Sequence, residues 1–218
     1  MIWNQFKRQL SSMQKKRNKI IQFSPPRSGS TLVTNILKEI FPSKTILKTH
    51  VCNEEISQYP VVVTYRHPLD CIASSIQAYE LSPTDSVIED KILGFERYGI
   101  WEILKIKNSS NVLMLQYEIF FNNFEVIYSG IEDFFNINIP LDKKNEITQK
   151  YDVNKIKTFI DKAGLSSFQE YDNSSLWHGN HISKYQGKPG YYKDFFTREQ
   201  IEYLKSIYHQ YLLELSYK

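Results

Sequence analysis

Residues 19–31 read KIIQFSPPRSGST, and they predict the first structural unit of the chain. The apolar run 19–24 ends at the Pro25-Pro26 breaker, which is typical of a buried parallel strand followed by a loop. Apolar residues then recur at helical spacing over 31–41, and Pro42 closes that segment. The stretch therefore predicts a strand, a short loop and a helix in direct succession.

Strands and helices continue to alternate after this unit. Strands are predicted at 45–50, 61–66 and 111–118, helices at 68–79, 84–108, 120–136, 142–163 and 197–215, and a loop rich in Gly, Pro and Tyr at 173–194. Such alternation indicates a parallel sheet covered on both faces. The predicted fold class is α/β: a single domain over residues 1–218, with a central parallel sheet flanked by helices and a basic N-terminal lead-in at 1–18.

The composition agrees with one globular domain. Of the 218 residues, 41% are hydrophobic and 23% charged, and the net charge of +3 is too small to indicate a nucleic-acid partner. Cys52 and Cys71 form no disulfide-rich pattern, so we expect a reducing compartment and place the protein in the cytoplasm. The N-terminus lacks the apolar run of a signal peptide, and no transmembrane segment is expected. The sequence does not indicate the oligomeric state.

The loop 24–31 carries the groups of an anion-binding site. Gly29 lets backbone N–H groups converge at the start of a helix, where the helix dipole presents partial positive charge. Hydroxyls of Ser28, Ser30 and Thr31 add hydrogen bonds, and Arg27 adds a permanent charge. A turn that merely caps the helix is the alternative interpretation. The nucleotide triphosphatase pattern Gly-x-x-x-x-Gly-Lys-Ser/Thr is absent, which disfavours ATP or GTP as ligand.

Two other strand ends carry polar side chains. The strand 61–66 runs into RHPLDCIAS, so Arg66 lies at a strand end and Ser74 about two turns into the next helix, where the pair can hold one phosphate. The strand 45–50 ends in ILKTH, and alternation places Lys48 and His50 on one face. An imidazole titrates near neutrality, which makes His50 a candidate general base. Glu54 and Glu55 are the alternative bases.

In this order, the segments resemble the donor site of sulfotransferases that use 3′-phosphoadenosine 5′-phosphosulfate (PAPS). The loop 24–31 is similar to the family's 5′-phosphosulfate loop, and Arg27 is closer to the branches acting on glycans and protein tyrosines than to the Lys-bearing small-molecule branch. Arg66 and Ser74 resemble the family's 3′-phosphate motif. The resemblance implies a P-loop-like sulfotransferase fold, PAPS as co-substrate, PAP as product and no metal.

The resemblance also implies roles for single residues. In the matching Lys-Thr-His segment of the family, the His takes the acceptor's proton and the Lys stabilises the transferring group. Tyr117 matches a Tyr that contacts adenine, Leu32 stands where cytosolic members carry a stacking Trp, and 187–190 resembles a loop that closes over the 3′-phosphate. The implied catalytic residues are His50, Lys48 and Arg27, and the implied donor-binding residues are Arg27, Ser28, Gly29, Ser30, Thr31, Leu32, Arg66, Ser74, Tyr117, Gly187, Lys188 and Gly190.

We therefore expect a sulfotransferase that moves a sulfuryl group from PAPS to a hydroxyl or amine of a small-molecule or glycan acceptor, with the Arg-type loop favouring a carbohydrate. The segments 80–108 and 120–180 carry no readable motif and are expected to build the acceptor pocket. His178 and His181 lie three residues apart, but no third metal ligand is evident, so acceptor contact or loop structure is expected. A non-catalytic PAP- or PAPS-binding module and a P-loop-type nucleotide kinase are the alternative functions.

Overall fold

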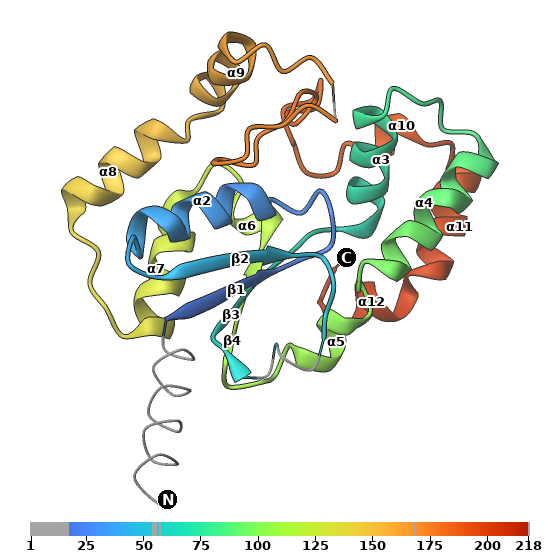
Figure 1. The fold of residues 1–218 in the computed structure, drawn as a ribbon. Coiled ribbons are helices and arrows are strands. Elements are labelled where there is room, and N and C mark those ends of the chain that lie inside the picture. Colours follow the sequence, from blue (N-terminus) through green and yellow to red (C-terminus); the bar gives the residue numbers. More distant parts are fainter. Residues whose placement is uncertain (1–17, 54–55, 57, 168, 218) are drawn as a thin grey trace, which may run out of the picture.

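The computed structural model describes residues 18–53, 56, 58–167 and 169–217. Its centre is a four-stranded parallel sheet in the order β2-β1-β3-β4 (Figure 1). The strands are β1 (Lys19–Phe23), β2 (Thr45–Thr49), β3 (Val61–Tyr65) and β4 (Val112–Gln116). The sheet confirms the predicted fold class, and its strands fall where the hydrophobic runs predict them.

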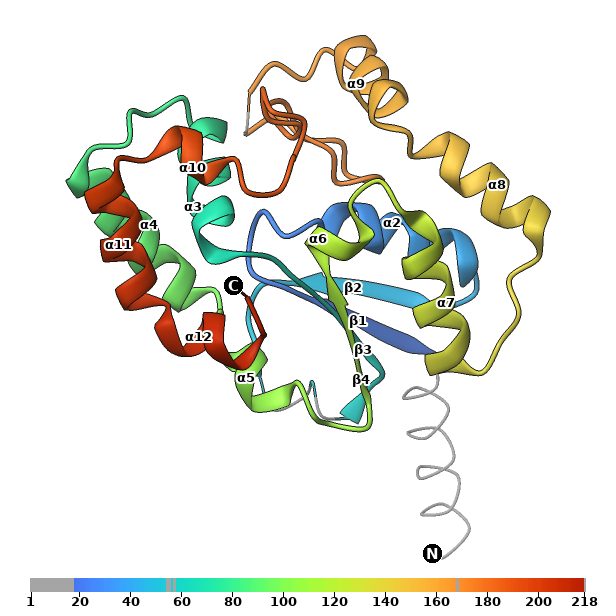
Figure 2. The ribbon, with the colours of Figure 1, turned by 180° about the vertical axis from the view of Figure 1, so that it is seen from behind.

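Helices cover both faces of the sheet (Figures 1 and 2). One layer consists of α2 (Ser30–Ile40), α6 (Tyr117–Phe120), α7 (Phe124–Phe135), α8 (Leu141–Lys150) and α9 (Val153–Lys162). The other consists of α3 (Pro68–Ala78), α4 (Asp85–Arg97), α5 (Glu102–Ile106), α10 (Tyr192–Phe195), α11 (Arg198–Ile207) and α12 (His209–Glu214). Among the described helices, none combines the length and the apolar character needed to cross a bilayer.

The two central strands are buried on both faces, as a parallel sheet requires. Ile21 and Val63 pack in the core with α3, α4 and α11, whereas Ile20 and Val62 pack with α2 and α7. Because side chains alternate along a strand, each central strand contributes to both hydrophobic cores. The sheet therefore lies between two hydrophobic cores, one on each of its faces.

Three segments predicted as continuous helical patterns are interrupted in the structure. The segment 84–108 contains α4 and α5, 142–163 contains α8 and α9, and 197–215 contains α11 and α12. In the second of these, the side chain of Asp152 accepts hydrogen bonds from the backbone N–H groups of Asn154 and Lys155 and so begins a new helix. Tyr117, predicted at a strand end, is the first residue of α6.

A buried polar cluster lies beneath the loop that follows β1. The hydroxyls of Ser24 and Thr64 are 2.7 Å apart, and the side-chain amide of Gln22 donates to Ser24. Ser28 donates to the carbonyl oxygen of Pro25 at 2.7 Å and lies 3.3 Å from the hydroxyl of Thr64. All four polar side chains are fully buried, so their mutual hydrogen bonds are needed to offset the cost of desolvation. These bonds tie the loop to β1 and β3.

The topology creates a crevice at the carboxyl ends of β1 and β3. The chain leaves β1 toward α2 on one face and leaves β3 toward α3 on the other, while β2 and β4 lie on opposite sides of this central pair. Ligands of open α/β sheets bind where the connections diverge in this way. The loop 24–29 and the residues after β3 are thus placed at the edge where a site is expected.

Candidate functional site

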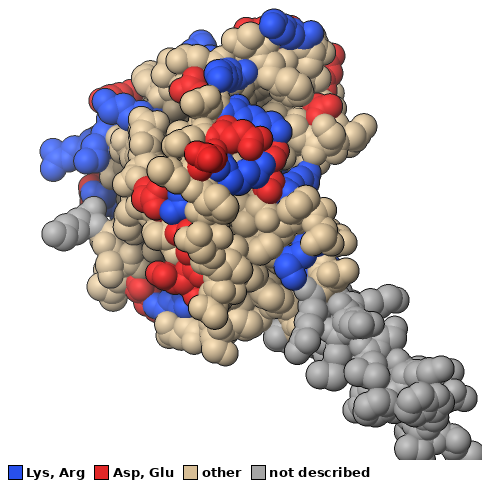
Figure 3. Space-filling model, turned by 90° about the vertical axis from the view of Figure 1, so that its left-hand side faces the viewer, with Lys and Arg blue, Asp and Glu red and all other residues tan. Residues whose placement is uncertain are grey.

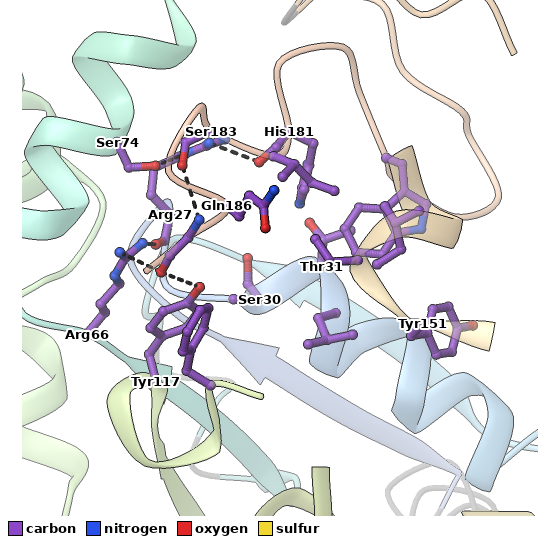
Figure 4. A pocket seen from close by; sticks show the side chains of 18 of the residues that line it. Arg27, Ser30, Thr31, Arg66, Ser74, Tyr117, Tyr151, His181, Ser183 and Gln186 are labelled. Atoms are coloured by element: carbon purple, nitrogen blue, oxygen red, sulfur yellow. Dashed lines mark hydrogen bonds between the residues drawn. The ribbon is translucent and has the colours of Figure 1, made fainter. Parts of the chain in front are cut away.

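A cavity of about 640 Å³ occupies this crevice. All of the predicted site residues line it except Ser28, Lys188 and Gly190. Figure 4 shows Arg27, Arg66 and Ser74 at one end, Tyr151 at the other, and Ser30 and Thr31 between them. The structure therefore gathers into one cavity residues that are separated by more than a hundred positions in the chain.

The loop 24–29 reaches α2 through two left-handed residues. Arg27 has φ 64° and Gly29 has φ 83°. A Cβ at Gly29 would lie 2.9 Å from Cζ of Phe120 and 3.0 Å from Cδ2 of Tyr117, so both the backbone and the packing require glycine there. No side chain caps α2, and its first N–H groups form the start of the helix that borders the cavity.

Arg27 spans the cavity from the loop to two other elements. Its Nε donates to the hydroxyl of Ser74 on α3 at 3.0 Å, and one terminal nitrogen donates to the carbonyl oxygen of His181 at 3.1 Å. Burial and then the neighbouring Arg66 lower the pKa of Arg27 to about 10, so the guanidinium stays charged at neutral pH. Two like charges held this close favour an anion between them.

Arg66 is almost completely buried, with 3% of its surface exposed. Its terminal nitrogens donate to the carbonyl oxygens of Arg27 at 3.3 Å and Gly187 at 3.1 Å, and its guanidinium carbon lies 4.3 Å from the centre of the Tyr117 ring. Among the described residues, no group accepts a hydrogen bond from its Nε. A buried cation with an unmatched donor is suited to an anionic ligand.

The loop 183–191 is held over this cation by side chains from elsewhere. The hydroxyl of Tyr117 donates to the carbonyl oxygen of Gly187 at 2.9 Å. The carboxylate of Asp70 accepts from the backbone N–H groups of Gly190 at 2.6 Å and Tyr192 at 3.1 Å. Gly190 therefore anchors the loop through its backbone N–H. The carbonyl oxygen of Lys188 accepts a hydrogen bond from Arg66 at 3.4 Å, whereas the Lys188 side chain is exposed.

Lys48 and His50 follow the predicted alternation and both line the cavity. Nζ of Lys48 donates to the hydroxyl of Thr31 at 2.8 Å, next to the start of α2. Burial, with help from Arg27 and Lys38, lowers the pKa of Lys48 to about 8. Burial and the charge of Lys48 lower the pKa of His50 to about 4, although its contact with Ser24 opposes the shift. At neutral pH the lysine is charged and the imidazole is neutral.

The opposite end of the cavity is apolar. Leu32 lines it from α2, and Phe120, Phe124, Tyr151 and Ile156 line it from the region without readable motifs. Glu39 on α2 accepts hydrogen bonds from Lys143, Lys150 and Tyr151, which holds α8 against α2. Two of these contacts, Lys143–Glu39 and Lys150–Glu39, are ion pairs. Figure 3 shows a face of the molecule on which acidic and basic side chains lie next to one another.

The sequence did not predict several of the residues that form the site. Asp70 lies inside the RHPLD segment, where its spacing of four from Arg66 gives a signal for an ion pair, and the two groups are 3.8 Å apart. Ser183 and Gln186 line the cavity from a loop whose sequence predicts only a turn. The alternative bases Glu54 and Glu55 lie outside the described residues. Within the described ranges, no three His, Cys, Asp or Glu side chains are grouped as metal ligands would be.

Three solved structures have similar folds. A mouse sulfotransferase, SULT7A1, complexed with PAP matches with a TM-score of 0.67 and 18% identity over 89% of this chain and 84% of that chain. Retinol dehydratase in complex with androsterone and the inactive cofactor PAP matches with a TM-score of 0.65 and 15% identity over 89% and 80%. Retinol dehydratase in complex with retinol and PAP matches with a TM-score of 0.64 and 15% identity over 89% and 81%. At these identities the likeness shows the fold.

A family comparison of the amino-acid sequence shows which family the chain belongs to. No curated protein matches the chain. The model of the sulfotransferase domain matches residues 41–216, a range that includes Lys48, His50, Arg66 and the loop 183–191 and begins after the anion-binding loop. The matches do not separate the branches of the family, so the closeness to the glycan and tyrosyl-protein branches stays a prediction. The enzyme class expected from the sequence is confirmed: the chain belongs to the sulfotransferase domain family.

Proposed function

We propose that the protein transfers a sulfuryl group from PAPS to a hydroxyl or amine of an acceptor, with a carbohydrate as the acceptor class. The chemistry of one end of the cavity supports PAPS as the donor. Arg27, Lys48 and Arg66 lie there beside the first turn of α2. A phosphosulfate and a 3′-phosphate are both anions that prefer such donors. The residues present therefore fit PAPS.

Two subsites follow from the positions of these cations. Arg27, the 28–31 segment and Lys48 surround the start of α2 and would hold the phosphosulfate. Arg66 and Ser74, under the loop 183–191, would hold the 3′-phosphate. The apolar end near Leu32 and Tyr151 would receive the adenine ring. Arg66 now donates hydrogen bonds to backbone carbonyl oxygens. When the 3′-phosphate binds, some of these hydrogen bonds would be replaced by hydrogen bonds to the phosphate.

The single observation that carries the proposal is the pairing of Lys48 and His50 beside the anion-binding loop. Nδ1 of His50 lies 2.6 Å from the carbonyl oxygen of Ser24. Because a carbonyl oxygen only accepts, Nδ1 carries the proton of the neutral ring and Nε2 is left as the basic nitrogen. This tautomer is the one that a general base requires.

These groups can carry out each step of sulfuryl transfer. The acceptor oxygen forms a bond to sulfur while the bond from sulfur to the 5′-phosphate oxygen breaks, and the electron pair of that bond goes to the phosphate. Nε2 of His50 takes the acceptor's proton. Arg27 and Lys48 stabilise the negative charge that grows on the leaving phosphate. The protein's contribution is thus positioning, proton removal and positive charge.

The test is transfer of labelled sulfate from PAPS by the wild-type protein and by His50→Gln. A positioned general base contributes about 10²–10⁴-fold, so turnover should fall by that factor while PAP affinity stays unchanged. His209→Gln, an exposed histidine on α12, is the matched control and should behave as wild type. Near wild-type turnover by His50→Gln would show that another group is the base.

Donor choice is tested separately by thermal stabilisation. PAP and PAPS should raise the melting temperature, because a ligand at 100 times its Kd stabilises by about 2.7 kcal/mol. We expect 5′-AMP and magnesium ATP to have little effect, since neither carries a 3′-phosphate for Arg66. Stronger stabilisation by ATP would contradict the proposed donor and favour a kinase.

A further inference from the structure

A second cavity meets the first one at the proposed reaction centre. It is a groove of about 850 Å³, and three residues line both cavities: Lys48, His50 and His178. The first cavity lies beneath the loop 183–191, whereas the groove opens to solvent beside the end of α3. Since a sulfuryl group must pass from one substrate to the other, the shared residues mark the place where donor and acceptor meet.

One wall of the groove is a short hairpin over residues 170–179. An isolated antiparallel bridge pairs Tyr171 with His178. The carboxylate of Asp172 accepts from the N–H of Ser175 at 2.7 Å and from the Ser175 hydroxyl at 2.7 Å. These bonds hold the hairpin turn in one shape.

The tip of the hairpin is bound to α2. The side-chain amide of Asn35 donates to the carbonyl oxygen of Ser175 at 2.6 Å, and Nζ of Lys38 donates to that of Ser174 at 2.7 Å. Both donors come from the helix that begins at the anion-binding loop. The hairpin is therefore fixed to the donor site, and Tyr171 and His178 are fixed with it.

The groove is lined by rings and neutral polar groups. Tyr79, at the end of α3, has 46% of its surface exposed, and Tyr171 has 57% exposed. Gln169 and Thr49 add an amide and a hydroxyl. The described residues that line the groove include no carboxylate, and Lys48, at the donor end, is the one Lys or Arg among them. Exposed tyrosine rings combine an apolar face with a polar edge, which suits flat ligands rich in hydroxyl groups.

We propose that this groove binds a neutral oligosaccharide, with Tyr171 and Tyr79 packing against sugar rings and His178 contacting the sugar that presents the reacting hydroxyl. An open groove accepts a chain of rings, whereas an isolated small alcohol would contact only part of its lining. This inference rests on the proposed function, because it assigns the acceptor of the same reaction. Tyr171 and His178 are then the residues that determine acceptor specificity.

The experiment measures binding first and transfer second. The PAP-loaded full chain is titrated with chitotetraose, cellotetraose and lacto-N-neotetraose and, as other acceptor classes, 1-naphthol and a tyrosine-containing peptide. Acceptor KM and kcat are then measured with labelled PAPS for the wild type, Tyr171→Ala, Tyr171→Phe and His178→Gln. Tyr203→Ala, a similarly exposed tyrosine on α11 outside both cavities, is the control.

At least one oligosaccharide should bind and be sulfated. Losing one ring contact should raise its KM about tenfold in Tyr171→Ala with kcat within about twofold, and Tyr171→Phe should restore the KM because it keeps the ring. His178→Gln should raise KM and lower kcat, and PAP affinity should be unchanged in every variant. Sulfation of 1-naphthol or the peptide without oligosaccharide binding, or an unchanged KM in Tyr171→Ala, would overturn the inference. Failure of the wild type to bind PAP would overturn the proposed function as well.

Discussion

Gly187 offers a sharp test of how the loop 183–191 is held over Arg66. Its φ is +77°, and an added Cβ would overlap the hydroxyl oxygen of Tyr117. Gly190 has nearly the same φ, +80°, but a Cβ there would meet nothing within 4 Å. Alanine at either position has the cost of a left-handed backbone, about 1–2 kcal/mol. Only Gly187→Ala adds the clash, so Gly190→Ala is the matched control.

The additional cost follows from what Tyr117 must give up. Moving its hydroxyl breaks the hydrogen bond to the Gly187 carbonyl, a net loss of about 0.5–1.5 kcal/mol. Moving its ring weakens the cation–π contact with Arg66, a loss of about 0.5–2 kcal/mol. For a domain of this size, each kcal/mol lowers Tm by about 2–4 °C. Together these losses come to about 1–3.5 kcal/mol, so we expect Gly187→Ala to melt about 2–14 °C below Gly190→Ala.

The assay combines thermal melting with PAP affinity. If Arg66 is displaced, one charge-assisted contact is lost, and PAP should bind about 10–150-fold more weakly to Gly187→Ala than to Gly190→Ala. Tyr117→Phe in the Gly187→Ala background should recover part of both losses, because the next nearest atom, Cζ of Tyr117, is 3.6 Å from the new Cβ. Equal melting temperatures and PAP affinities for the two alanine variants would refute this account of the loop.

Two further predictions concern Lys48 and Asp70. The pKa of Lys48 is about 8 and that of His50 about 4, so kcat/KM should be constant between these values and fall above pH 8 as the ammonium loses its proton. Lys48→Arg should move the alkaline limb upward, and an unmoved limb would assign it to another group. Asp70→Asn leaves a buried N–H of the 190–192 segment poorly paired and should cost about 1–3 kcal/mol in unfolding experiments, whereas the exposed Asp194→Asn should cost little.

The sequence predicts the donor end of the site because that end depends on local order. Arg27 and Gly29 lie between a strand and a helix. Arg66 lies between the next buried strand and its helix, and Ser74 is about two turns into that helix, so the positions of these residues follow once the elements are assigned. The parallel sheet then brings the strand ends to one edge.

Apart from Leu32, the apolar end was not predictable in the same way. Tyr151 lies at the cavity because α8 packs against α2, where Glu39, more than a hundred residues earlier, accepts hydrogen bonds from Lys150 and Tyr151. Such long-range pairs leave no periodic pattern in the sequence. The same is true of the hairpin at 170–179, which depends on Asn35 and Lys38 for its place.

The polar cluster beneath the anion-binding loop has a consequence for ligand association. Because Thr64 on β3 bonds the hydroxyl of Ser24, with Ser28 close by, the shape of the loop is set by the sheet and not by the nucleotide. A nucleotide that meets a loop already in its bound shape loses little ordering entropy on contact. Its encounter with the loop would then be a single kinetic step, in which the long-range field of Arg27 and Lys48 accelerates the approach of an anion and no loop rearrangement limits its capture.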